Sequence, residues 1–124
     1  MNTIRIRAGT IEMEAELNDS PTARLVWETL PIEGRANRWG EEIYFSIPVK
    51  TGSEAGAQQD VDVGDLGYWP PGSAFCIFFG PTPVSSGSRP RAASPVNLLG
   101  KLTGDATRFR QVKDGDKVIL ERAA

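Results

Sequence analysis

The start of the chain alternates so regularly between apolar and charged side chains that it predicts a β-hairpin over residues 3–17. Apolar residues alternate with arginines from residue 4 to residue 8, and with glutamates after Gly9-Thr10. A two-residue connection with glycine first is typical of a type II′ turn. Apolar side chains then share one face and opposite charges meet on the other, so turn and strands agree on one register. That register pairs Ala8 with Ile11, Arg7 with Glu12, Ile6 with Met13 and Arg5 with Glu14.

The rest of the chain predicts more short strands and one clear helix. Asp19 or Ser20 suits the N-cap of a helix that ends at Pro31. Its apolar stripe favours a core position for Trp27. A second helix is expected near 105–111, and strands are expected at 38–50, 66–69, 74–79, 96–102 and 118–120. This pattern indicates a single all-β domain over residues 1–124, a closed or nearly closed barrel with a helix covering an open end.

The block 64–86 concentrates aromatic residues beside a rigid corner. Pro70-Pro71-Gly72 fixes the corner, because proline presets φ and glycine accepts a φ that other residues avoid. The strand at 74–79 is apolar on both faces, which favours a core position for most of its rings. Trp69 at the corner is the best candidate for a pocket wall, where its face could stack on a planar ligand. The aromatic residues of the block are Tyr68, Trp69, Phe75, Phe78 and Phe79.

The chain contains no histidine and a single cysteine, Cys76. The absence of histidine excludes a Ser-His-Asp triad, a Cys-His dyad and histidine-ligated zinc. Cys76 is expected to be an inert core thiol. One cysteine allows no internal disulfide, which fits a reducing, cytoplasmic location. No cofactor and no metal site is predicted.

The charge pattern favours neither nucleic acid nor a membrane as a partner. The 14 basic and 16 acidic residues are mixed along the chain and give a net charge of −2. No basic stripe of the kind that binds phosphate backbones is visible. No apolar run approaches the roughly 20 residues of a membrane span, and the start of the chain lacks the apolar core of a signal peptide.

Polar candidates for a cleft lie on the strand at 38–50. Glu42 and Tyr44 share one strand face, which is either solvated or lines a cleft in which they would act as acceptor and donor. Glu41 and Glu42 are neighbours in a strand and point to opposite faces, so they do not form the carboxylate pair of a glycosidase.

Three further features lie in loops or at strand ends. Asn97 either binds a ligand carbonyl or caps a turn. Arg89 and Arg91 either grip an anion or are simply solvated. The polar, glycine-containing segment 51–60 is expected to be the most mobile loop, and it would be the lid of a cleft if one exists.

Six stretches of the sequence carry a family resemblance that covers nearly the whole chain. They are Trp39–Phe45, Gly64–Gly72, Phe78–Gly80, Thr82–Ser85, Ala92–Asn97 and Lys113–Val118. In these stretches the chain resembles a family of uncharacterised prokaryotic proteins with a cyclophilin-like domain. The resemblance implies a cyclophilin-like barrel of about eight strands with one or two short helices.

The opening hairpin and first helix are more distantly similar to cyclophilins that are peptidyl-prolyl isomerases. The Phe-His-Arg and Gly-Ser-Gln-Phe-Phe motifs of those enzymes are absent, and the corresponding strand here begins Gly72-Ser73-Ala74-Phe75. Arg38 stands in a roughly comparable stretch and would be the hydrogen-bond donor of an isomerase.

The residues and the resemblance together predict a non-catalytic binding module rather than an active isomerase. Its ligand would be a peptide or a small organic molecule in an aromatic-lined cleft; the oligomeric state stays open. The alternatives are a peptidyl-prolyl isomerase and an enzyme that uses Glu42 with Tyr44 on a small metabolite. The expected ligand-binding residues are Arg38, Glu42, Tyr44, Trp69, Pro71, Phe79, Ser85 and Asn97.

Overall fold

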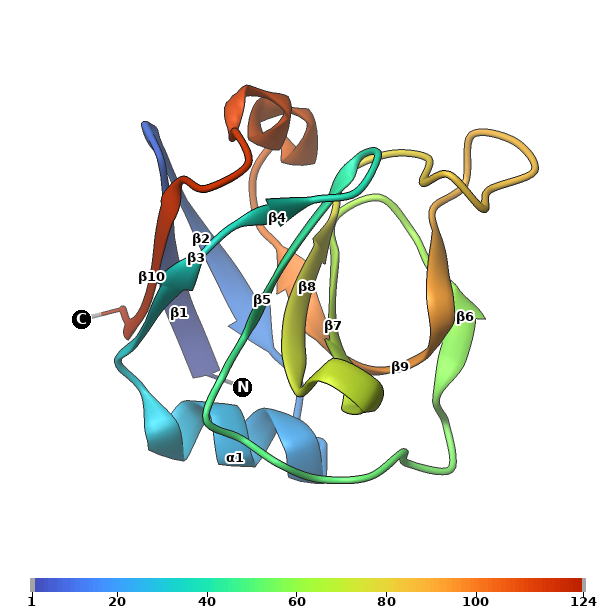
Figure 1. Cartoon of the computed structure of the whole chain (residues 1–124). Helices are drawn as coiled ribbons and strands as arrows, with labels where there is room; N and C mark the ends of the chain where they lie inside the picture. The colour runs from blue at the N-terminus through green and yellow to red at the C-terminus, as the bar shows by residue number, and fades with distance from the viewer. Residues whose placement is uncertain (1, 124) are drawn as a thin grey trace.

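The computed structural model describes residues 2–123 and is mostly β, with strands that curl around a common interior (Figure 1). The strands are β1 (Asn2–Ala8), β2 (Ile11–Leu17), β3 (Ile32–Arg35), β4 (Asn37–Arg38), β5 (Glu42–Ser46), β6 (Gln58–Asp60), β7 (Asp65–Trp69), β8 (Ala74–Phe78), β9 (Arg91–Leu102) and β10 (Lys117–Arg122). The helices are α1 (Pro21–Thr29) and two 3₁₀ segments, η1 (Pro70–Gly72) and η2 (Ala106–Gln111). Among the described residues, no helix is long and apolar enough to cross a membrane.

The predicted N-terminal hairpin is confirmed in its register and its turn. β1 pairs with β2 so that Ala8 lies opposite Ile11 and Arg7 opposite Glu12. Gly9 has a φ of +57°, as the first central position of a type II′ turn requires. Arg7 Nε lies 2.9 Å from Glu12 Oε1 on the solvent face, while the apolar face is buried. Local sequence alone is therefore enough to predict the register of this element.

The sheet is not closed by hydrogen bonds, which corrects the closed barrel expected from the sequence. Its strands follow the order β3-β10-β1-β2-β9-β7-β8-β5-β4, with β6 on β9. The end strands β3 and β4 do not pair with each other, yet they are consecutive in the chain and joined by Ala36. One extended segment thus begins beside β10 and finishes beside β5, and it counts as two of the ten strands. A Cβ added at Gly34 would lie 2.9 Å from the Phe45 ring, so that ring packs against the backbone along this seam.

Helix α1 lies across one end of the curled sheet, and η2 lies at the other end (Figure 1). Ser20 caps α1 by accepting a hydrogen bond from the Ala23 backbone N–H at 3.2 Å, and Pro21 occupies the first turn. Val26 is buried, as its place on the apolar stripe predicts. Trp27 is only half-buried: it packs on the core at its edge, and the Arg122 guanidinium carbon lies 4.4 Å from the centre of its ring.

Strand β8 separates two apolar clusters, as its apolar sequence on both faces predicts. Phe75 and Ile77 belong to the main core inside the curl, whereas Ala74, Cys76 and Phe78 belong to a second cluster on the outer face. All five residues of the strand are buried. The outer face of the sheet is therefore covered here by other parts of the chain.

Strand β9 provides much of that cover. Its first half pairs with β6, and its second half pairs with β7 and β2. A Cβ added at Gly67 of β7 would lie 2.9 Å from Val96 Cγ2, so the missing side chain lets β9 approach the outer face closely. The region between this half of β9 and strands β5, β7 and β8 contains the candidate site.

The segment 51–60, expected to be the most mobile loop, is held at several points, and its last three residues form β6. The Glu54 backbone N–H donates to Asn97 Oδ1 at 2.8 Å, and Asn97 Nδ2 donates to the Gly52 carbonyl at 3.0 Å. The Glu54 carboxylate accepts a bond from the Thr22 backbone N–H at 3.0 Å. These contacts tether the segment to β9 and α1.

Candidate binding pocket

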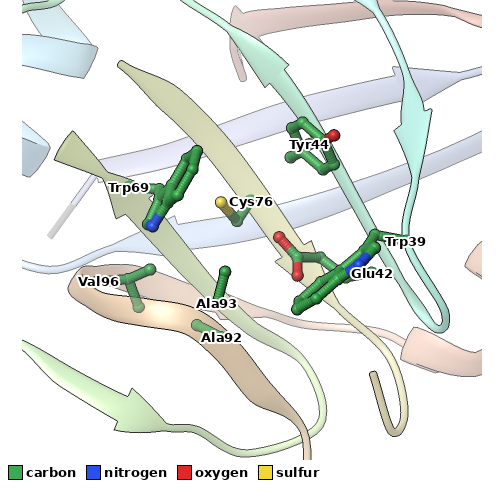
Figure 2. Close-up of a pocket in the computed structure, with 8 residues that line it drawn as sticks. All are labelled: Trp39, Glu42, Tyr44, Trp69, Cys76, Ala92, Ala93 and Val96. Carbon is green, nitrogen blue, oxygen red and sulfur yellow. The ribbon is translucent and has the colours of Figure 1, made fainter. Parts of the chain in front are cut away.

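A cavity of about 240 Å³ opens on the outer face of the sheet, between strands β5, β7 and β8 on one side and the first half of β9 on the other. Its walls are largely apolar and contain three aromatic rings, and Figure 2 shows these side chains converging from four parts of the chain. The lining residues are Trp39, Glu42, Tyr44, Trp69, Cys76, Ala92, Ala93 and Val96. Of the expected site residues, the structure thus brings together Glu42, Tyr44 and Trp69.

A tight turn at the end of β4 places Trp39 beside Glu42. The backbones of these two residues exchange both hydrogen bonds, at 2.9 and 3.2 Å, across the two-residue connection Gly40-Glu41. Gly40 has a φ of +60°, and a Cβ there would lie 2.9 Å from Thr82 Cα. Directly opposed residues of a hairpin project from the same face, so the indole and the carboxyl both reach the cavity.

The Glu42 carboxyl group is the main polar feature of the cavity. Glu42 is only 5% exposed, and its Oε1 has no hydrogen-bond partner among residues 2–123. Burial raises the pKa of this carboxyl from its ordinary 4.5 to about 7, against a smaller lowering by a hydrogen bond with Cys76. In Figure 2 the carboxyl points into the space between Trp39 and Cys76. The Tyr44 hydroxyl points away from it, so the two side chains do not bond to each other, although both line the cavity.

Trp69 forms the opposite wall and is fixed from two sides. Its Nε1 donates a hydrogen bond to Ser94 Oγ at 2.7 Å, which ties β7 to β9. Its ring lies against Gly72, where a Cβ would come within 2.9 Å of the ring carbons. The proline corner thus orients the indole, which forms part of the cavity wall (Figure 2).

Cys76 lies on β8 directly opposite Tyr44 and is buried at the back of the cavity. Burial, reinforced by the nearby Glu42 charge, raises the pKa of its thiol well above the usual value. A thiol held in this form is a poor nucleophile, in keeping with the predicted inert role. The described part of the chain contains no cluster of three or more histidine, cysteine, aspartate or glutamate side chains that could hold a metal ion.

Arg38 and Phe79 lie together, but outside the cavity lining. The Arg38 guanidinium carbon sits 5.0 Å from the centre of the Phe79 ring. Arg38 also donates to the carbonyls of Gly40, Arg110 and Val112 at 2.8–2.9 Å. This arginine thus holds the β4–β5 turn against the chain beyond η2.

The remaining expected residues bond to loops or lie in turns, outside the cavity. Asn97 is buried and satisfied by Gly52, Glu54 and the Thr22 hydroxyl. Ser85 Oγ accepts a bond from the Thr82 backbone N–H at 3.0 Å, which closes a turn. Pro71 lies in η1 and is exposed. None of the three lines the cavity.

The loop arginines are paired within the chain. Arg91 Nη1 lies 3.0 Å from Asp60 Oδ1, and Arg89 Nε lies 3.5 Å from Asp62 Oδ1. These pairs join the start of β9 and the loop before it to β6 and the residues that follow β6.

Trp39 and the three β9 residues are cavity residues that the sequence analysis missed. Trp39 carried a usable signal, because Gly40-Glu41 repeats the glycine-first pattern of the N-terminal turn and sets Trp39 opposite Glu42. Ala92, Ala93 and Val96 carried no such signal in the sequence, because their position in the cavity lining depends on how β9 curls over a distant strand.

The chain is similar to proteins of known structure. The hypothetical protein AF2241 from Archaeoglobus fulgidus, known from a solution structure, is 41% identical, with a TM-score of 0.83 over 98% of this chain and 95% of that one. McbB, solved in complex with tryptophan, has a TM-score of 0.71 and 17% identity over 98% of this chain and 45% of that one, a likeness of fold alone. No curated protein matches the chain.

A family model described as cyclophilin-like matches residues 2–121, which is nearly the whole chain. Together with the curled sheet and the likeness to the archaeal protein, this match shows that the chain belongs to the cyclophilin-like family.

Proposed function

We propose that the protein binds a small organic molecule in the cavity between Trp39 and Trp69. The observation that carries this proposal is the Glu42 carboxyl, which is buried at the cavity wall with an unpartnered oxygen. Leaving a buried polar group without a hydrogen bond costs about 1–3 kcal/mol. A ligand that donates to Glu42 offsets this cost, so the site is complete only when it is occupied.

The size and lining of the cavity indicate the kind of ligand. Its volume of about 240 Å³ lies below the range of about 300–1,000 Å³ typical of sites for drug-sized molecules. Broad indole faces stack well on planar or compact apolar groups. The ligand is therefore a small molecule with an apolar body and one group that bonds to Glu42, rather than a long peptide.

A carboxylate-using enzyme is the second candidate. A carboxyl with a pKa of about 7 exchanges protons readily at neutral pH, which suits a general acid or base. The isomerase alternative has less support, because the guanidinium of Arg38, its expected donor, is already bonded to three backbone carbonyls.

Nuclear magnetic resonance tests binding with a built-in control. The chain has three tryptophans, of which Trp39 and Trp69 line the cavity and Trp27 does not. The ¹⁵N-labelled protein is titrated with indole, phenol, choline, an Ala-Pro peptide and tryptophan, the last because McbB was solved with it. We expect at least one probe to shift the indole N–H signals of Trp39 and Trp69 and to leave that of Trp27 in place.

Two variants and one further spectrum sharpen the result. Trp69→Ala is expected to abolish the shifts, whereas Trp27→Phe keeps them. Exchange spectra of the Ala-Pro peptide report any catalysed cis–trans conversion and so test the isomerase alternative. The proposal fails if no probe shifts either cavity indole at millimolar concentration.

A further inference from the structure

The cavity has the character of an anionic, π-rich site. Among residues 2–123, its ionisable lining side chains are Glu42, Tyr44 and Cys76, and no lysine or arginine lines it. The other described residues of the lining contribute the Trp39 ring, the Cys76 thiol and apolar side chains of β9, and no charged group. Arg38, four positions before Glu42, bonds to backbone carbonyls, and Arg110 pairs with the neighbouring Glu41. A negative charge on Glu42 thus lacks a cationic partner within the described chain.

Hydrogen-bond donors for an anionic ligand are also scarce in the cavity. Trp69 Nε1 is already committed to Ser94 Oγ, and the Tyr44 hydroxyl points away from Glu42, so among the described residues the Trp39 indole N–H is the one ring donor left beside this carboxyl. The rings offer mainly their faces, which carry the negative side of the aromatic quadrupole. Aromatic faces beside a carboxylate are the combination that attracts ammonium groups.

We infer that the cavity selects a small organic cation, an ammonium group on a compact apolar body, which pairs with Glu42 between the faces of Trp39 and Trp69. This inference rests on the proposed function and names the class of its ligand. A neutral molecule of the same shape would leave the charge of Glu42 uncompensated in an apolar wall.

A matched pair of probes isolates the charge. Choline and 3,3-dimethylbutan-1-ol have nearly the same shape, and they differ in a quaternary nitrogen that replaces a quaternary carbon. Titration calorimetry at pH 8 is expected to show choline binding at least tenfold more tightly than the alcohol. Equal affinities would overturn the inference, because they would show that only shape and apolar contact matter.

The pH dependence gives a second, independent readout with a defined sign. With the Glu42 pKa at about 7, about one carboxyl in thirty is ionised at pH 5.5 and about nine in ten at pH 8. If choline needs the ionised form, its affinity rises about thirtyfold between these pH values. A neutral ligand that accepts a bond from protonated Glu42 would show the opposite trend, and that trend for choline would contradict the inference.

Two carboxyl variants locate the effect. Glu42→Gln keeps the size of the side chain and removes the charge, so it should lose both the preference for choline and the pH dependence. Glu41→Gln is the matched control, because the neighbouring carboxyl pairs with Arg110 outside the cavity. Choline affinity unchanged in Glu42→Gln, or lost equally in both variants, would overturn the inference.

The outcome separates this inference from the proposed function. If indole or phenol shifts both cavity tryptophans and choline does not bind, the cavity binds small molecules and the cation assignment is wrong. If no probe of the panel binds, both are wrong. Far-ultraviolet circular dichroism of each variant confirms that the fold is intact before affinities are compared.

Discussion

The Glu42 carboxyl links the stability of the protein to pH. Its pKa is about 7 in the folded chain against an ordinary 4.5, so between these values the folded protein keeps a proton that the unfolded chain has released. The stabilisation by this proton is present below pH 4.5 and is lost as the pH rises to 7. The shift corresponds to a loss on the order of 3 kcal/mol.

Glu42→Gln is expected to remove this dependence, because an amide does not titrate in this range. The variant should match the wild type near pH 4.5 and exceed it in free energy of unfolding at pH 8. Urea unfolding of both proteins at the two pH values measures their free energies of unfolding. Subtracting the wild-type value from the variant value at each pH cancels the contribution of the other carboxylates, because both proteins contain them. If the difference in free energy of unfolding between the variant and the wild type were the same at both pH values, Glu42 would have an ordinary pKa.

Gly67 is the residue whose missing side chain shapes the cavity wall. A Cβ there would lie 2.9 Å from Val96 Cγ2 and 3.1 Å from Val96 Cβ, so Gly67→Ala should push β9 outward and cost about 1–3 kcal/mol. Gly87→Ala is the control, because a Cβ at Gly87 would meet nothing within 4 Å. Thermal unfolding measures the stability of both variants. Similar stabilities would contradict the close contact between Gly67 and Val96.

At the scale of elements, the hairpin of β4 and β5 presents half of the site. Gly40→Ala forces a side chain into a left-handed conformation, which costs about 1–2 kcal/mol, and adds a contact of 2.9 Å with Thr82 Cα. We expect lower stability together with weaker probe binding, because Trp39 and Glu42 lose their shared turn. Unchanged binding would show that the turn does not position the site.

The two glycine-first turns show where sequence reasoning works. Gly9-Thr10 lies between two strongly alternating strands, so pattern and turn agree and the register follows. Gly40-Glu41 has the same chemistry, but β4 is only two residues long and offers no pattern to confirm it. The site residues Glu42, Tyr44 and Trp69 were predictable from local pattern, whereas Arg38 and Asn97 serve packing that depends on partners more than 40 residues away.

At the scale of the whole molecule, Asn97 joins three parts of the fold. Its amide bonds the segment at Gly52 and Glu54 and the Thr22 hydroxyl of α1, all from β9. Asn97→Ala leaves these groups unsatisfied and should cost about 1–3 kcal/mol. Hydrogen exchange is expected to speed up at the Glu54 amide before it does in β1 and β2. Uniform acceleration throughout the chain would show that the tether is not a local one.

The sequence was sufficient to predict the curled sheet of the family, but not which strands lie at its two ends. The resemblance and the strand pattern indicated a barrel, and the short β3 and β4 gave no alternation from which to place them. Their partners, β10 and β5, lie far apart in the chain, and at the seam this segment is what joins them. Which strands meet at the seam is decided by packing such as Phe45 against Gly34, and local pattern does not report it.

The position of β10 between β3 and β1 has a consequence for the order of folding during synthesis. A nascent chain that ends before Lys117 lacks the strand that joins these two, so the facing edges of β1 and β3 stay open. The remaining sheet can form its hairpins but lacks the partner that unites β3 with β1. The native topology is therefore completed only after residues 117–122 have left the ribosome, and until then the open edges of β1 and β3 are free to pair wrongly.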